Sequence, residues 1–281
     1  MRALASRYPL MSFIAINYAI SWTFLYPAYQ MVLHSPGRFP PLALIGLIGA
    51  YGPSIAAIIV VGAIRGGVGV RELLGKFLLW RVGARWYLVA LLVPIGVYLA
   101  AVLLQMPGHA DLRQGLAGIP LAIIIALPFG PLAEELGWRG FFLPELLRRY
   151  SPLKSTLIVG CVWSAWHLAS FSFPGAAIPS YLHVNAWSVF LFFCDITTLS
   201  FVFTFVFRRT GGSVLLAVLV HLAFDARDNM INAFFPLVRS TVGIAPRVYI
   251  TAILLMGALA VLCAIRDARK PGHVLIAEGG R

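Results

Sequence analysis

The peptide Glu-Glu-Leu-Gly-Trp-Arg at residues 134–139 places three ionisable side chains inside the apolar stretch 119–147. A charged side chain at the centre of a bilayer costs roughly 2.5–3.5 kcal/mol on insertion scales, so residues of this kind usually have a function. Two later apolar stretches carry similar groups: His167 lies in one, and His221 and Asp225 lie in the other. Acids and imidazoles in helices of membrane length predict a hydrolytic site inside the membrane.

Most of the chain is apolar, since 60% of its 281 residues are hydrophobic and only 11% are charged. A soluble domain could not keep so much apolar surface from water. Eight apolar stretches approach or exceed the roughly 20 residues that cross a bilayer: Tyr8–Val32, Pro41–Ile64, Trp86–Gln105, Ile119–Leu147, Ser155–Phe173, Trp187–Phe207, Ser213–Phe235 and Arg247–Ile265. The sequence therefore predicts an all-α polytopic membrane protein, a bundle of about eight transmembrane helices with an intramembrane cavity.

The net charge of +12 is unevenly distributed between the loops. When the loops are assigned alternately to two sides, one side collects 16 basic residues and the other collects five, Arg227 among them. Basic residues accumulate on the cytoplasmic side of membrane proteins, so both termini are expected in the cytoplasm. This distribution favours contact with anionic lipid headgroups and argues against nucleic acid as a partner. The compact, arginine-rich loops point to a bacterial plasma membrane.

The ionisable groups of three stretches are predicted to lie at one depth. Glu134 precedes the basic end of its helix by 13 residues, His167 follows the corresponding end by 12, and His221 by 10. With a helical rise of 1.5 Å per residue, each lies about 15–20 Å from that end. The three groups are therefore expected in one layer, reached by a polar cavity from the cytoplasm.

Angular position separates the two glutamates. Glu135 and Arg139 are four residues apart on one helical face, which favours an ion pair. Glu134 points about 100° away from Glu135, on the face of Trp138, and is the better candidate for a free carboxylate. Pro128 and Pro131, just before the acidic pair, are expected to interrupt the helix.

The histidines have similar local relationships. His221 and Asp225 are four residues apart and can act as one unit. Trp163 lies one turn before His167 and can form a wall of the pocket. Asp195, in the middle of the sixth stretch, can pair with Arg139 or line the cavity.

Peptide hydrolysis needs a base for the attacking water, an acid for the leaving amine and donors for the oxyanion. A carboxylate and two imidazoles in one layer can fill these roles. Glu134 is the candidate base, one histidine can complete the hydrogen bonding of the water, and the other can donate to the oxyanion.

In order, spacing and membrane context, the three motifs resemble those of the CPBP (ABI) family of intramembrane proteases, which includes the type II CAAX prenyl endopeptidases. The first family motif, Glu-Glu-x-x-x-Arg, is matched by Glu134, Glu135 and Arg139. The second, an aromatic residue followed by x-x-x-His, is matched by Trp163, where phenylalanine is usual, and by His167. The third, His-x-x-x-Asn or Asp, is matched by His221 and Asp225.

The resemblance covers about residues 119–235 and implies three parts of the chain. Residues 1–118 hold N-terminal transmembrane helices and a basic cytoplasmic loop. Residues 119–235 form the catalytic core, and residues 236–281 form a last transmembrane helix and a cytoplasmic tail. The resemblance implies an endopeptidase that cleaves near the cytoplasmic side of the membrane, with a peptide or a membrane protein as its substrate.

The resemblance also implies roles for the motif residues. Glu134 and His167 would activate the water, and His221 with the residue at position 225 would support the oxyanion. An ionised Asp225 would repel an oxyanion, so it is protonated, or it orients His221, or the site holds a metal. Zn²⁺ could be bound by the set Glu134, His167, His221 and Asp225. Because the chain lacks a His-Glu-x-x-His sequence, we expect a site without metal.

Three other interpretations explain part of the pattern. The charged residues could form a buried ion-pair cluster that only fixes helix packing. A proton-coupled transporter also places acids and histidines in membrane helices, although no duplicated halves with broken helices are evident. A non-catalytic immunity or partner protein of the same family would keep the motifs. The sequence leaves open the oligomeric state and whether a substrate is prenylated.

Overall fold

The computed structural model describes residues 2–105, 110–173, 175–240 and 243–269. Within these ranges every regular element is helical and no strand occurs, which confirms the all-α prediction. The α-helices are α1 (Arg2–Arg7), α2 (Pro9–Leu33), α3 (Gly46–Ala50), α4 (Gly52–Gly75), α5 (Ala84–Gln105), α6 (Leu112–Phe129), α7 (Pro131–Gly137), α8 (Leu143–Leu147), α9 (Pro152–Trp166), α10 (Ala186–Arg209), α11 (Val214–Phe234), α12 (Leu237–Ser240) and α13 (Ile244–Arg269). Short 3₁₀ helices occupy Pro41–Ile45, Lys76–Leu78 and His167–Ser172, and a π-helical turn occupies Trp138–Phe142.

Five helical segments in the described part of the chain are long and apolar enough to cross a bilayer: Gly52–Leu78, Ala84–Gln105, Leu112–Leu147, Ala186–Arg209 and Ile244–Ala268. The chain is thus a polytopic membrane protein, but the count of eight spans is not confirmed. Helix α9 has only 15 residues, about 22 Å at the helical rise. Helix α11 is continuous, but it carries three ionisable residues, His221, Asp225 and Arg227.

The second predicted span, Pro41–Ile64, is wrong in its boundaries. Residues Pro41–Ala50 form a 3₁₀ turn and the short α3, and α4 begins afresh at Gly52 with a proline in its first turn. Proline suits a helix start because the first backbone N–H groups of a helix have no acceptor within that helix. Helix α4 then continues beyond Ile64 through a kink at Gly66, whose φ of 64° is accessible to glycine.

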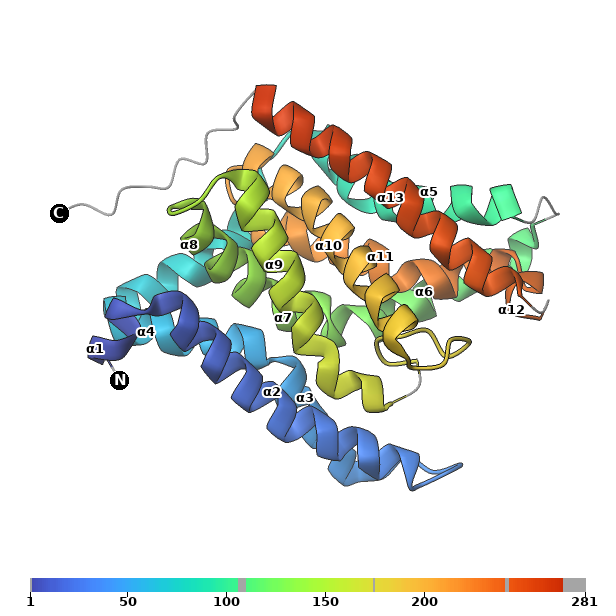
Figure 1. Ribbon diagram of the computed structural model, residues 1–281, viewed down its shortest axis with the longest axis horizontal. Helices are drawn as coiled ribbons and strands as arrows, with labels where there is room; N and C mark the ends of the chain where they lie inside the picture. The colour runs from blue at the N-terminus through green and yellow to red at the C-terminus, as the bar shows by residue number, and fades with distance from the viewer. Residues whose placement is uncertain (1, 106–109, 174, 241–242, 270–281) are drawn as a thin grey trace.

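The helices surround α7, which carries the acidic pair. Helices α2, α3 and α4 pack together on one side of the molecule, and α5 and α13 lie side by side on the other (Figure 1). Helix α7 packs against α4, and it also packs against α11 and α6. Ionisable groups on α7 are consequently far from solvent and must find partners on neighbouring helices.

The predicted interruption before the acidic pair is present at Gly130. Helix α6 ends at Phe129, and α7 starts at Pro131, whose missing N–H is not required at a first helical position. Glu134 consequently falls in the first turn of a new helix rather than in the middle of a continuous one.

Several basic segments meet at one end of the bundle. One cavity is lined by residues from several elements: Ser6 of α1, Arg65 within α4, Lys76 directly after α4, Arg148 after α8 and Gly211 after α10. An ion pair between Arg208 and Asp267 joins the ends of α10 and α13 at this basic face. This agrees with the predicted grouping of basic loops, whereas their cytoplasmic location stays a prediction. The predicted tail, from residue 270 onwards, lies outside the described residues.

Candidate active site

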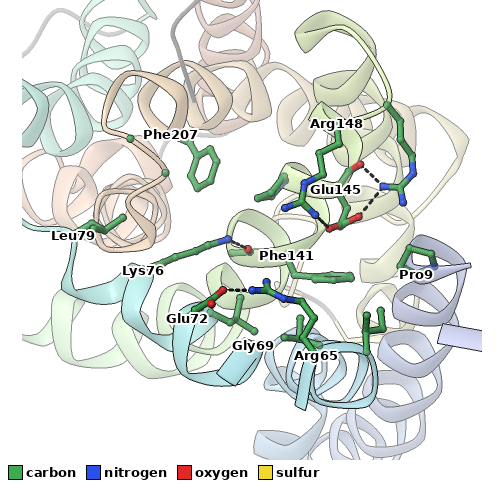
Figure 2. Close-up of a pocket in the computed structure, with 18 of the residues that line it drawn as sticks. Pro9, Arg65, Gly69, Glu72, Lys76, Leu79, Phe141, Glu145, Arg148 and Phe207 are labelled. Atoms are coloured by element: carbon green, nitrogen blue, oxygen red, sulfur yellow. Dashed lines mark hydrogen bonds and ion pairs between the residues drawn. The ribbon is translucent and has the colours of Figure 1, made fainter. Parts of the chain in front are cut away.

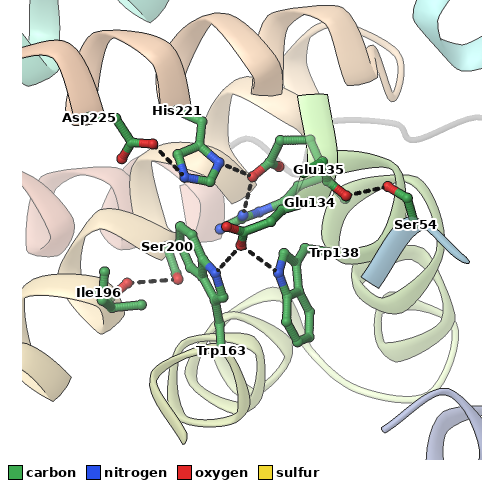
Figure 3. A network of polar contacts seen from close by, with 11 residues as sticks. Ser54, Glu134, Glu135, Trp138, Trp163, Ile196, Ser200, His221 and Asp225 are labelled. Atoms are coloured by element: carbon green, nitrogen blue, oxygen red, sulfur yellow. Dashed lines mark hydrogen bonds and ion pairs between the residues drawn. The ribbon is translucent and has the colours of Figure 1, made fainter. Parts of the chain in front are cut away.

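Glu134 is held by two tryptophans. Its carboxylate oxygen Oε2 accepts hydrogen bonds from Nε1 of Trp138 at 3.0 Å and from Nε1 of Trp163 at 2.7 Å (Figure 3). Trp138 lies one turn further along the same helical stretch, whereas Trp163 comes from α9. Glu134 itself is 4% exposed. A phenylalanine at position 163 would pack in the same place but could not donate, so the tryptophan has a polar role here.

Glu135 forms the ion pair that its spacing predicted. Its Oε1 accepts from Nη1 of Arg139 at 2.8 Å, and both side chains are fully buried. The same oxygen also accepts from Nδ1 of His221 at 2.7 Å, a contact between α7 and α11. A buried carboxylate with two cationic or potentially cationic donors is well compensated, which explains how it is tolerated at this depth.

The Arg139 guanidinium is also enclosed by aromatic rings. Its carbon atom Cζ lies 3.5 Å from the ring centre of Phe203 and 4.2 Å from that of Trp163. Arg139 lies in the π-helical turn Trp138–Phe142, a wide turn often found at functional sites. Cation–π contacts stabilise a guanidinium that is removed from water. Arg139 is therefore a structural centre of the site, as its sequence position predicted.

His221 lies between two carboxylates. Its Nδ1 faces Glu135, and its Nε2 lies 3.4 Å from Oδ2 of Asp225. The His221 side chain is 4% exposed, whereas that of Asp225 is 30% exposed. The predicted unit of His221 and Asp225 is present, and Asp225 is the member of the pair that can be reached from outside.

Gly130 is a site residue that the sequence analysis missed. A Cβ atom at this position would lie 2.5 Å from Oδ2 of Asp225 and 3.2 Å from Nε2 of His221. Glycine therefore lets the backbone break between α6 and α7 approach the His221–Asp225 unit without displacing the Asp225 carboxylate. Its signal in the sequence was its place between two closely spaced prolines, Pro128 and Pro131.

His167 lies next to this network rather than in it. Among the described residues its only side-chain hydrogen bond joins Nδ1 to the carbonyl oxygen of Trp163, at 2.9 Å. Because a carbonyl can only accept, Nδ1 carries the proton, and Nε2 of the neutral ring keeps its lone pair. The ring packs against those of Trp166 and Phe192, with centroids 4.7 and 5.1 Å away.

Trp163 joins the three groups that were predicted to share a layer. Its indole donates to Glu134, and its ring centre lies 5.2 Å from that of His221 and 6.0 Å from that of His167. The three side chains thus lie close together around one tryptophan, whereas their depth in a membrane stays a prediction. Trp163 therefore contacts all three groups, whereas its spacing in the sequence predicted only a wall of the pocket.

The N-terminal helices support this site, although no motif covers them. Ser54 of α4 donates to the carbonyl oxygen of Ala133 at 2.6 Å. A Cβ at Gly137 would lie 2.4 Å from the backbone of Pro53, so α4 and α7 are in close contact. The ring of Phe13 from α2 packs against that of Trp138, with centroids 5.4 Å apart.

Asp195 has another ion-pair partner than Arg139, which the sequence suggested. Its Oδ2 lies 3.5 Å from Nη2 of Arg227, and both side chains are buried. Arg227 was counted with the loops, but it lies within α11, with its guanidinium 3.3 Å from the ring centre of Phe224. Arg227 is tolerated inside the bundle because the carboxylate of Asp195 on α10 and the aromatic face of Phe224 on α11 itself compensate its buried charge.

The candidate zinc ligands do not form a metal site as arranged. No group of three or more His, Cys, Asp or Glu side chains in the described ranges, which include all four candidates, could hold a metal ion. Some coordinating atoms of this set already face hydrogen-bond partners: Oε2 of Glu134 receives two indole protons, and both nitrogens of His221 face carboxylates. Metal dependence of the protein stays a prediction to be tested.

A cavity of 670 Å³ opens at the basic face rather than at the candidate catalytic side chains (Figure 2). It reaches Gly140 and Phe141, which follow Arg139 directly, but none of Glu134, His167, His221 and Asp225 lines it. The cavity predicted around the catalytic groups therefore stays a prediction.

Comparisons with known proteins agree with the motifs. Residues 116–227 match the family model described as type II CAAX prenyl endopeptidase Rce1-like. A curated relative, CAAX prenyl protease 2 of Methanococcus maripaludis, is 26% identical over 150 residues. This match covers 51% of the present chain and 55% of the relative. The resemblance to the CPBP and Rce1-like proteases is thus confirmed over the part of the chain that carries all three motifs.

Proposed function

We propose that the chain is an intramembrane endopeptidase in which Glu134 activates the attacking water. One observation carries this proposal: the two adjacent glutamates have opposite surroundings. Glu135 is compensated by Arg139 and by His221, whereas Glu134 receives, from the described residues, only the neutral N–H groups of two indoles. An indole orients a carboxylate without neutralising its charge, so Glu134 keeps the capacity to take a proton.

The two indoles also determine which oxygen of Glu134 acts. Both bind Oε2, and no described residue donates to Oε1. Oε1 is therefore the oxygen that accepts a proton from water. His167, whose Nδ1 proton is bound to the carbonyl of Trp163, accepts a second hydrogen bond from that water at Nε2. The hydroxide then attacks the peptide carbonyl, and the proton held by Glu134 passes to the leaving amine.

His221 and Asp225 serve the oxyanion in this scheme. A protonated His221 donates from Nδ1 to Glu135, and its Nε2 proton points toward Asp225. Nε2 of His221 and Oδ2 of Asp225 are 3.4 Å apart, and Asp225 is partly exposed. The substrate oxygen can therefore replace Asp225 as the acceptor of the hydrogen bond from Nε2–H. Asp225 then orients His221 in the resting state, which is one of the three roles open to it. This arrangement requires no metal.

The substrate class follows from the relatives and from the membrane setting. We propose a peptide whose scissile bond lies close to a membrane anchor, cleaved near the basic, cytoplasmic face. Because the curated relative is named a CAAX prenyl protease, a prenylated peptide with a C-terminal Cys-a-a-X sequence is the first substrate to test.

The experiment compares wild-type protein with the variant Glu134→Gln and a control, Glu72→Gln, in lipid vesicles. Glu72 is exposed and forms an ion pair with Arg65 on the basic face. Release of the C-terminal fragment from prenylated and unprenylated peptides is followed. We expect cleavage by wild type and by Glu72→Gln, and none by Glu134→Gln. Cleavage by Glu134→Gln at the wild-type rate would remove Glu134 from the mechanism. If properly folded wild-type protein cleaved neither peptide, a non-catalytic partner protein would be favoured.

A further inference from the structure

The cavity at the basic face carries an excess of positive charge. Its lining includes four cationic and two acidic side chains, namely Arg65, Lys76, Arg148 and Arg149 against Glu72 and Glu145. Arg65 pairs with Glu72, and Glu145 alone accepts from both arginines that follow α8. The Lys76 ammonium donates to the uncharged carbonyl of Gly140 (Figure 2).

Two positive charges in the cavity therefore have no carboxylate of their own. One belongs to Lys76 and the other is shared by Arg148 and Arg149, which divide the single charge of Glu145. Arg148 and Arg65 repel the Lys76 ammonium, and the two carboxylates of the lining attract it from a distance without pairing with it. Like charges around a concave surface raise the local concentration of anions, and an anion between them relieves the repulsion.

The lining also has an apolar part. Val61, Ile64, Leu73, Phe141 and Phe207 contribute to the same walls. The volume of 670 Å³ lies within the range of about 300–1,000 Å³ that is usual for small-molecule pockets. A ligand that fits both parts of this lining has an anionic group and an apolar body.

We propose that this cavity binds the phosphate headgroup of an anionic membrane lipid, with Lys76 and the pair of Arg148 and Arg149 as its ligands. A lipid is favoured over a free phosphate because of the apolar walls and because the cavity lies among the basic loops. Anionic headgroups are attracted to such segments at the membrane surface. The proposal does not depend on proteolysis, since it concerns residues outside the candidate active site.

The site is tested with purified protein in detergent. Phosphatidylglycerol is compared with phosphatidylcholine by native mass spectrometry and by thermal unfolding. The variants are Lys76→Gln, which removes one of the two excess charges, and the double change Arg148→Gln with Arg149→Gln, which removes two positive charges and so the whole net excess. The control is Lys154→Gln, which removes an exposed charge nearby but outside the cavity.

Wild type and Lys154→Gln should retain phosphatidylglycerol in preference to phosphatidylcholine and should unfold at a higher temperature with it. The binding of phosphatidylglycerol should be about tenfold weaker in the double arginine variant. Lys76→Gln should show a similar loss, and if it does not fold, the arginine variant decides, because its side chains are largely exposed. Equal binding in all variants would overturn the site. Inorganic phosphate is added in a separate measurement. If it stabilised the protein as much as phosphatidylglycerol does and displaced that lipid, the assignment to a lipid would be overturned.

Discussion

Two glutamate–arginine pairs on one stretch of chain have the same local geometry and different surroundings. Glu135–Arg139 and Glu145–Arg149 are both separated by four residues, and both have N–O distances of 2.8 Å. The first pair is completely buried, whereas the side chains of the second are 15% and 39% exposed. Sequence spacing creates either pair, but the surroundings determine what it does. The buried pair organises a site, and the exposed pair borders a cavity.

The buried region has a second feature that the exposed region lacks. Next to Glu135, which is compensated, stands Glu134, which is oriented by neutral donors. Only a water-poor environment makes this difference chemically useful, because in water both carboxylates would be solvated alike. The predictions below separate catalytic effects from structural ones, and buried effects from exposed ones.

The largest effect is expected from Glu134→Gln, which should reduce the rate of peptide cleavage by at least about 10²–10⁴-fold. Glutamine keeps the shape of the side chain and an oxygen for the indole donors, so the unfolding temperature should hardly change. Single-turnover cleavage and thermal unfolding of the same preparation measure the two quantities. A large loss of stability would instead identify Glu134 as a packing residue.

The next effect contrasts the two ion pairs directly. Arg139→Leu or Glu135→Gln should lower the free energy of unfolding by about 3–5 kcal/mol, because each leaves a buried group uncompensated. The matched changes Arg149→Leu and Glu145→Gln should cost about 0–1 kcal/mol. Chemical unfolding in detergent measures all four.

The same set of variants includes a check on the buried pair. Replacing Glu135 and Arg139 together should cost less than the sum of the two single changes, since neither charge is then left alone. If the double variant is no better folded than the singles, the pairing inferred for the buried region is wrong.

An intermediate effect is expected from Gly130→Ala. The new Cβ would lie 2.5 Å from Asp225, and forcing extra atoms into a packed site typically costs about 1–3 kcal/mol. Gly211→Ala is not a fair comparison because φ is positive there, so Gly96→Ala, with open space around it, serves as the control. Activity should fall in the first variant and not in the second. Equal activity would show that the backbone break does not constrain the His221–Asp225 unit.

A smaller effect is expected from Trp163→Phe, which keeps an aromatic ring but removes one donor to Glu134. The lost hydrogen bond to a charged group is worth about 1.5–3 kcal/mol. Because Glu134 is then oriented less firmly, the cleavage rate should fall. Trp166→Phe is a matched control, because Nε1 of Trp166 has no hydrogen-bond partner in the described part of the chain. The proposal that the indole orients the base fails if both changes affect the rate equally.

The smallest effect is expected from Asp225→Asn and from chelators. If Asp225 only orients His221, asparagine should preserve activity or raise it, because its amide can donate to an oxyanion. Chelators should leave the wild-type rate unchanged. Zinc bound in a one-to-one ratio, and lost together with activity in Asp225→Asn, would establish the metal alternative instead.

Local spacing was enough to predict part of this molecule. Apolar stretches of membrane length predict helices because a bilayer leaves backbone groups no other way to be satisfied. The i, i+4 relationships of Glu135 with Arg139 and of His221 with Asp225 follow from helical periodicity alone, and both contacts are present. The prediction of a common layer followed from the helical rise, which is the same in every helix.

The contacts that give the site its character were decided only by tertiary structure. His221 meets Glu135 across 86 residues, and Trp163 meets Glu134 across 29. The approach of Gly130 to Asp225 and the pairing of Arg227 with Asp195 likewise join different elements. Periodicity specifies which side chains share a face, but it does not specify which neighbouring helix covers that face. That choice depends on the packing of all the helices at once, so the sequence determined the members of the site, and the fold determined their partners.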